Sequence, residues 1–159
     1  MPPASEKLSD QELHSLLKEE YLRIQAFTQS FDDKAITVKA WSVTFSLASI
    51  IGAFATHSQA VILVAGLSAV AFWLTEGYIR AYQYAYYDRA GVIEKYFSGE
   101  RGTISPLQTG SSWASSFAKI GFLKLVKILL WPEVLLPHAL PIVISVVLFP
   151  LVALGVLSL

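Results

Sequence analysis

The stretch that decides the fold is residues 40–75, which read AWSVTFSLASIIGAFATHSQAVILVAGLSAVAFWLT and contain no Asp, Glu, Lys or Arg. A hydrocarbon core is crossed by about 20 helical residues, so this stretch is too long for one span and long enough for two. Its only polar cluster is THSQ at residues 56–59. We therefore predict membrane-spanning helices at residues 35–55 and 60–79, joined by a short turn.

Small side chains mark the faces through which these two spans would pack. In lipid, where apolar surfaces gain little by leaving their surroundings, small residues let helix backbones approach closely. We expect an antiparallel hairpin whose packing faces consist of Ser42, Ser46, Ser49 and Ala53 on the first span and Ala65, Gly66 and Ala69 on the second.

A second charge-free tract, residues 134–159, predicts a third span at about residues 141–159. Pro150 removes a backbone donor there and should kink the helix. A re-entrant or interfacial segment is the alternative, because three prolines punctuate the region.

The distribution of Lys and Arg predicts the orientation. The turn at residues 56–59 has none, whereas both flanks of the hairpin carry several. By the positive-inside rule, the N-terminus and residues 80–133 lie in the cytoplasm. Trp41 and Trp73 fall at the same predicted depth opposite the turn, as an interfacial aromatic belt requires.

The cytoplasmic parts also have helical patterns. Ser9 and Glu12 have the spacing of a capping box. Apolar residues then recur at helical spacing over residues 9–31, with no Pro or Gly before Trp41, so this helix should continue into the first span. The N-terminal helix, the hairpin and its extension form one part, residues 1–97. We expect the two legs of the hairpin to extend into the cytosol and to pack there on each other as an antiparallel helical stalk.

A linker at residues 98–110, with three Gly and one Pro, leads into a second part, residues 111–159. We expect one helix from Ser111 to Trp131. Its lysines share one side, which is typical of an interfacial helix that binds anionic lipid headgroups through Lys119, Lys124 and Lys127.

Glu76 is the single acidic residue within a predicted span, so it is a candidate to bind or relay a cation. The simpler interpretation places it at headgroup depth, paired with Arg80 four residues on. A tyrosine cluster follows, and it predicts either a contact with another copy or a partner, or an interfacial belt combined with packing of the stalk: Tyr78, Tyr82, Tyr84, Tyr86 and Tyr87.

The sequence gives little reason to expect a metal site, a cofactor, catalysis or nucleic-acid binding. The chain has no cysteine, and His14, His57 and His138 lie on separate segments, so we predict no metal site and no cofactor. We expect His138 at the interface where the third span begins. No pattern of catalytic residues or phosphate loop is present, and 12 basic against 12 acidic residues give no reason to expect nucleic acid as a partner.

Three segments resemble a group of small, uncharacterised bacterial membrane proteins: DDKAITVKAWS at residues 32–42, FWLTEG at 72–77 and LPHAL at 136–140. The resemblance extends from about residue 20 to about residue 150. It implies a bacterial inner-membrane location and carries no activity. The layout is also similar to the two-span, SLATT-type effector domains of bacterial conflict systems, from which the third predicted span departs.

The sequence therefore predicts an all-α, non-enzymatic membrane protein that self-associates, and the SLATT-like layout would make it an effector or sensor in defence against phage. One alternative is a channel or transporter component that uses Glu76. Another is a membrane anchor that recruits a soluble partner through the helix at residues 9–31.

Overall fold

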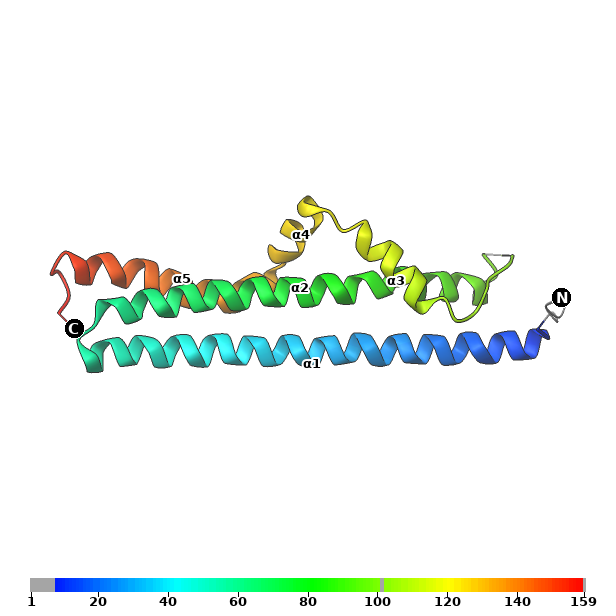
Figure 1. Cartoon of the computed structure of the whole chain (residues 1–159), viewed down its shortest axis with the longest axis horizontal. Helices are drawn as coiled ribbons and strands as arrows, with labels where there is room; N and C mark the ends of the chain where they lie inside the picture. The colour runs from blue at the N-terminus through cyan, green and yellow to red at the C-terminus, as the bar shows by residue number, and fades with distance from the viewer. Residues whose placement is uncertain (1–7, 101, 159) are drawn as a thin grey trace, which may run out of the picture. The chain divides into compact units, whose positions relative to one another are not determined.

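The computed structural model describes residues 8–100 and 102–158, and every regular element among them is an α-helix. The elements are shown in Figure 1: α1 (Asp10–Thr56), α2 (Gln59–Phe97), α3 (Thr109–Ala118), α4 (Phe122–Leu129) and α5 (Pro132–Ala153). By length and composition, α1, α2 and α5 could each cross a membrane. The predicted all-α fold with three candidate spans is therefore confirmed, and it indicates a membrane protein.

Two very long helices, α1 and α2, are each continuous from the predicted cytoplasmic part into the predicted span. The capping box at the start of α1 is confirmed: Glu12 Oε2 accepts the N–H of Ser9 at 2.9 Å and its hydroxyl at 2.7 Å. The Glu12 N–H in turn donates to Ser9 Oγ at 3.3 Å. The turn between the helices consists of His57 and Ser58 and is made tight by the left-handed backbone of His57, with φ 51°.

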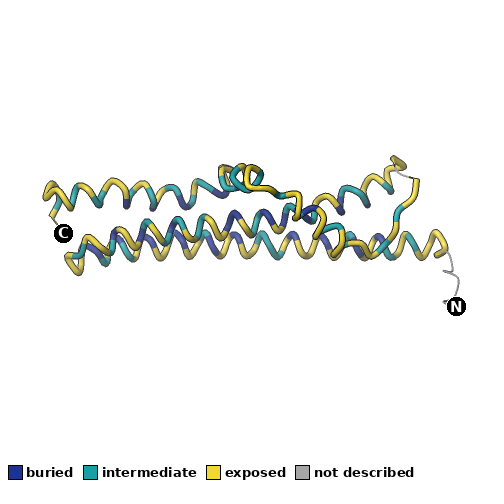
Figure 2. Tube along the Cα trace, turned by 45° about the horizontal axis from the view of Figure 1, so that its top comes forward, coloured by how far each residue is buried: buried dark blue, intermediate teal, exposed yellow. Residues whose placement is uncertain are grey.

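The chain forms two compact units, and both α1 and α2 contribute to each. Unit 1 consists of the described residues up to Phe31 together with Tyr82–Ile120. Its core is built on Leu17, Ile24 and Ile93. Unit 2 consists of Asp32–Ala81 together with the described residues from Gly121 onward. In unit 2, buried positions recur along α1, α2 and α5 (Figure 2).

The single helix expected at residues 111–131 is wrong, because α3 and α4 are separate helices. Gly121 adopts an extended backbone with φ −76° and ψ 173° and stands at the start of α4. Glycine costs about 1 kcal/mol relative to alanine inside a helix, so this position favours a break. As a result Lys119 follows the end of α3, while Lys124 and Lys127 belong to α4.

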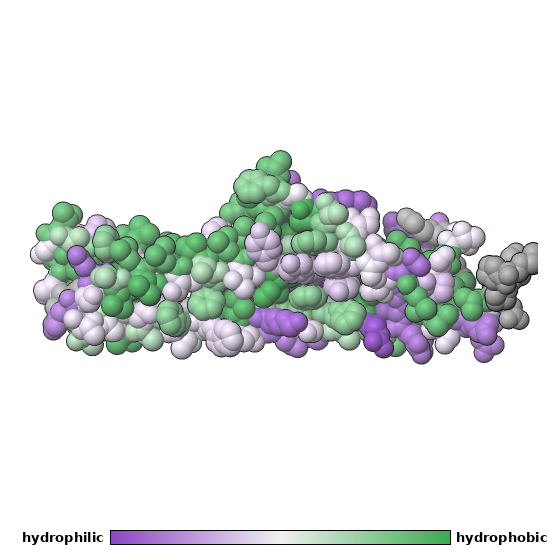
Figure 3. Space-filling model, viewed as in Figure 1, coloured by the Kyte–Doolittle hydropathy of each residue, from purple (hydrophilic) through white to green (hydrophobic). Residues whose placement is uncertain are grey.

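The third candidate span begins earlier and ends earlier than residues 141–159. Pro132 is the first residue of α5, where its missing N–H costs nothing. The helix ends before Gly155, whose φ of 69° allows the N–H of Val156 to reach the carbonyl of Leu151 at 2.9 Å. Apolar side chains cover the outer face of α5 (Figure 3), with exposed Leu136, Leu140, Val143, Val146 and Val147.

Candidate functional site

Glu76 lies in a buried polar cluster of unit 2 that joins α1, α2 and α5. Its Oε2 lies 2.9 Å from Nε2 of His138 on α5, and the other ring nitrogen, Nδ1, lies 2.7 Å from Oγ of Ser42 on α1. The three residues are each 0% exposed. One chain of hydrogen bonds therefore connects the three candidate spans.

Two basic side chains approach Oε1, the other oxygen of the Glu76 carboxylate. Lys39 Nζ is 3.0 Å from Glu76 Oε1, and Arg80 Nε is 3.8 Å from it. Arg80 also pairs with Asp32 of α1. The exposed fraction of these side chains rises from 0% for Glu76 to 12% for Arg80, 22% for Lys39 and 42% for Asp32. The cluster therefore extends from a closed interior to the accessible surface.

The two oxygens of Glu76 differ in how they are bound. Oε2 is hydrogen-bonded to His138, whereas Oε1 has ion pairs but accepts no aligned hydrogen bond from any residue that the structure describes. Buried polar atoms are almost always hydrogen-bonded. Glu76 Oε1 therefore retains acceptor capacity at a buried position.

Formal charges in the cluster cancel when His138 is neutral, because Lys39 and Arg80 offset Glu76 and Asp32. An ionised carboxylate only accepts hydrogen bonds, so Nε2 of His138 must then donate to Glu76. Nδ1 is left as an acceptor, and the hydroxyl of Ser42 donates to it. The hydrogen-bond network thus assigns a single tautomer to the neutral ring.

Local sequence explains why these side chains meet. Lys39 and Ser42 are three residues apart on α1, and Glu76 and Arg80 are four apart on α2, so each pair lies on one helix face. Close packing of α1 on α2 is shown by Ser46, whose hydroxyl donates across the helices to the carbonyl of Ala65 at 3.4 Å. Large residues in place of Ser46 and Ala65 would hold α1 and α2 apart and leave Glu76 without its partners.

The predicted small-residue faces lie largely inside the chain. The structure places one serine and one glycine differently from the rest: Ser49 is half-buried, and Gly66 faces α5, where an added Cβ would lie 2.9 Å from Ser145 Cβ. The remaining members are buried at 0% exposure: Ser42, Ser46, Ala53, Ala65 and Ala69. These faces are therefore occupied within one copy and not available to a second.

The predicted interfacial aromatics divide between solvent-accessible and packed positions. Trp41 is 61% exposed and Tyr78 is 50% exposed. Trp73 of α2 instead donates its indole N–H to the carbonyl of Leu129 in α4 at 2.9 Å. Leu129 also packs on Gly77, where a Cβ would lie 2.3 Å from its Cδ2. The end of α4 is thus fixed on α2 beside Glu76.

In unit 1, two of the predicted tyrosines hold α3 in place. Tyr82 stacks on Trp113 and Phe117, with ring centroids 5.9 Å and 4.8 Å apart. Tyr86 contacts Trp113 at 6.0 Å, and the Trp113 indole donates to the Tyr82 carbonyl at 3.1 Å. Much of the tyrosine cluster is therefore used for packing within the chain.

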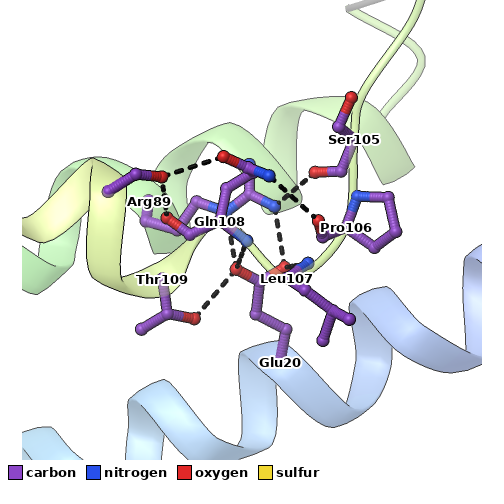
Figure 4. A network of polar contacts seen from close by, with 8 residues as sticks. Glu20, Arg89, Ser105, Pro106, Leu107, Gln108 and Thr109 are labelled. Carbon is purple, nitrogen blue, oxygen red and sulfur yellow. Dashed lines mark hydrogen bonds and ion pairs between the residues drawn. The ribbon is translucent and has the colours of Figure 1, made fainter.

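A second buried carboxylate lies in unit 1, where Glu20 of α1 faces Arg89 of α2 and the start of α3 (Figure 4). Arg89 donates from Nε to Oε1 at 2.9 Å and from Nη2 to Oε2 at 2.7 Å. The carboxylate also accepts the N–H groups of Leu107 and Gln108, both at 2.9 Å, and the hydroxyl of Thr109 at 2.8 Å. Glu20 thus fixes the residues that lead into α3 from a different helix, at the end of α3 where a negative charge suits the helix dipole.

The ionisation of Glu20 follows from these contacts. Burial alone would raise the pKa of this carboxyl, but the hydrogen bonds from Arg89 and Thr109, the charge of Arg89 and the Leu107 N–H together hold the pKa below its ordinary value. The carboxylate therefore stays charged in unit 1 and remains an acceptor for all of its donors.

The sequence missed His138, the hydrogen-bond partner of Glu76 in the buried chain. His138 is fully buried within α5, against Glu76 and Ser42, and these contacts were not predicted from the sequence. The separation of His138 from Glu76 by 62 positions hides the contact. The available signal was that an acid and an imidazole on apolar helices are each costly in lipid unless they pair. The Glu20 network, which joins α1, α2 and a loop, was missed for the same reason.

Other candidate residues are spread over the units. Lys119 and Lys127 are exposed and Lys124 is half-buried. Leu17 and Ile24, from the helix proposed to recruit a partner, are 0% exposed in the core of unit 1.

Among residues 8–100 and 102–158, no group of three or more His, Cys, Asp or Glu is arranged to hold a metal ion. Comparison with protein-family models, curated proteins and solved structures finds no match for the chain.

Proposed function

We propose that this protein is a component of a membrane channel or transporter in which Glu76 binds and passes on the ion. The observation that carries the proposal is the fully buried Glu76, hydrogen-bonded to His138 and ion-paired with Lys39. A charged residue inside the bilayer is costly, so ionisable groups within spans commonly mark ion pathways and proton relays.

The proposal places the protein in a bacterial inner membrane with the N-terminus in the cytoplasm. Lys39, Arg80 and Asp32 then lie toward the cytoplasmic ends of the spans, where their exposed fractions are highest within the cluster. The ion would therefore exchange with the cytoplasm through this side of the site.

Self-association is part of the same proposal, because a passage for ions is commonly completed between copies. The surfaces available for it are the exposed aromatic residues Trp41, Tyr78 and Tyr87. The small-residue faces no longer support it, since they are buried within the chain. Mass measurement in mild detergent tests the assembly, and a strictly monomeric particle contradicts it.

Ion flux into liposomes tests the function directly. The purified protein is reconstituted in separate samples with a trapped dye for protons, sodium or potassium, and a gradient of the tested ion drives the flux. We expect wild-type flux and its loss in Glu76→Gln, because the neutral amide keeps the shape of the side chain and removes its charge. Glu133→Gln is the matched control, as Glu133 is an exposed glutamate in the first turn of α5. Absence of wild-type flux, or equal loss in both variants, contradicts the proposal.

A further inference from the structure

We infer that the ion taken up at this site is a proton and that His138 is the group that receives it. This inference rests on the proposed function and specifies its ion. It is carried by the geometry of the buried chain, in which each ring nitrogen of His138 has one partner, Ser42 on one side and Glu76 on the other.

The charge balance of the cluster disfavours a metal cation. With His138 neutral, the two acids are already offset by Lys39 and Arg80, and both basic groups approach the one oxygen of Glu76 that has spare acceptor capacity. A metal ion placed there would meet two positive groups at close range. Hard cations also require about six oxygen ligands, whereas a proton requires a single lone pair. The lone pair on Nδ1 of His138 provides it.

The charged groups around the ring come from two helices. Lys39 and Asp32 belong to α1, and Glu76 and Arg80 belong to α2. On α5 itself, the sequence carries no Asp, Glu, Lys or Arg from Val134 to its end. Glu76 is therefore the direct counter-ion for a protonated ring, with its Oε2 at 2.9 Å.

Proton uptake would reverse the role of Ser42. In the neutral state the Ser42 hydroxyl donates to Nδ1. When a proton binds the Nδ1 lone pair, the ring becomes an imidazolium and both nitrogens donate. The Ser42 oxygen must then accept, and its own hydrogen can turn to the carbonyl one helical turn earlier in α1. A hydronium ion supplies the proton, so one of its O–H bonds breaks as the Nδ1–H bond forms, and the charge of the cluster rises by one.

Release then follows from the second ring nitrogen. The imidazolium transfers its Nε2 proton to Oε2 of Glu76, which leaves a neutral ring in the other tautomer and a neutral carboxylic acid. Glu76 loses this proton to water through the more exposed side formed by Lys39 and Asp32. The starting tautomer returns when Nδ1 gives up its hydrogen and Nε2 gains one by exchange with water, because rotation of the ring alone would leave the hydrogen on Nδ1. His138 and Glu76 thus act in series, with His138 taking up the proton and Glu76 releasing it.

The test is ¹⁵N NMR of His138 in liposomes, with His14→Gln and His57→Gln present so that one histidine remains. At alkaline pH we expect a neutral ring with its hydrogen on Nε2, and on acidification both nitrogens should become protonated. Ser42→Ala should allow both neutral tautomers to appear, because the hydroxyl that selects one is gone. Ser46→Ala is the matched control: Ser46 is equally buried one turn further along α1 and bonds Ala65 instead.

The outcomes separate this inference from the proposed function. A ring that stays neutral in the folded protein over the whole titration overturns the inference, as does flux that follows a sodium gradient and ignores the pH gradient. A ring that takes up a proton in liposomes that pass no ions instead contradicts the proposed function and supports the assignment of His138. An unchanged tautomer in Ser42→Ala overturns the role given to Ser42.

Discussion

Glu20 in unit 1 and Glu76 in unit 2 are both buried carboxylates on a scaffold of α1 and α2, yet they are bound in different ways. Glu20 is 4% exposed and accepts two hydrogen bonds from Arg89 as well as two backbone N–H groups and a hydroxyl. Glu76 is 0% exposed and accepts a hydrogen bond from one neutral or charged imidazole, while its second oxygen is held by ion pairs alone.

The difference separates a structural carboxylate from one that can change state. Arg89 remains protonated at any pH that proteins tolerate, and backbone donors cannot turn away, so Glu20 has one stable arrangement. His138 can gain a proton and Ser42 can reverse its hydroxyl, so Glu76 has two. We therefore expect changes at Glu20 to alter stability and changes at Glu76 to alter ion flux.

The largest expected effect on stability is at the Glu20–Arg89 pair. Arg89→Ala leaves a buried carboxylate without its counter-ion, which typically costs about 3–5 kcal/mol of unfolding free energy. Chemical denaturation in detergent micelles, followed by the near-UV circular dichroism of the tryptophans, measures it. Trp113 reports on this unit because it stacks on Phe117 at 5.1 Å in α3.

The matched comparison is Glu76→Gln, which should lose flux while its unfolding free energy changes much less than in Arg89→Ala. Lys39 is 22% exposed and can turn toward water, and Arg80 keeps Asp32. If Arg89→Ala abolishes flux at temperatures where it remains folded, the separation between a structural and a functional carboxylate is wrong.

A smaller effect is expected when acid removes the charge of Glu20. Against the opposing effect of burial, the pKa of Glu20 is held below its ordinary value chiefly by Arg89 and Thr109. The stabilisation that the charged carboxylate gives to the folded protein is therefore complete above the ordinary carboxyl pKa. This stabilisation is lost as the pH falls through the lowered pKa of Glu20. Hydrogen exchange of the backbone amides of Leu107 and Gln108 should therefore accelerate only in strong acid.

The control for this pH effect is Glu20→Gln. That variant should exchange these amides faster at neutral pH and show little further dependence on acid. Equal acid dependence in both proteins would mean that another carboxyl controls the docking of α3, and the role assigned to Glu20 would then be excluded.

Local sequence predicted most of the helices and little of the two networks. Charge-free tracts located the three candidate spans, and the Ser9–Glu12 spacing located the start of α1, because both signals arise from neighbouring residues. The pairing of Glu76 with His138 depends on how α5 packs against α2. No periodicity within either helix reports that packing. The break before Phe122 was missed because the amphipathic spacing continues on both sides of Gly121.

Two glycines on α2 provide the most delicate comparison, one in each unit. At Gly77, beside Glu76, a Cβ would lie 2.3 Å from Leu129 Cδ2 and 2.9 Å from its Cγ. Gly77→Ala should push Leu129 away and weaken the hydrogen bond from Trp73 to the Leu129 carbonyl. It should lower the free energy of unfolding by about 1–3 kcal/mol, as overpacking usually does.

At Gly91 in unit 1, a Cβ would meet no described atom within 4 Å. Gly91→Ala should therefore stabilise the protein by up to about 1 kcal/mol through helix propensity.

Thermal unfolding measures the stability of both variants, and the ion flux shows whether Gly77→Ala also affects ion passage. If α4 helps to close the site beside Glu76, Gly77→Ala should also lower proton flux or make it less selective, because Leu129 is fixed next to that residue. Gly91→Ala should leave flux unchanged, since unit 1 contains neither Glu76 nor His138. Equal flux in the two variants would show that α4 contributes to stability and has no part in ion passage.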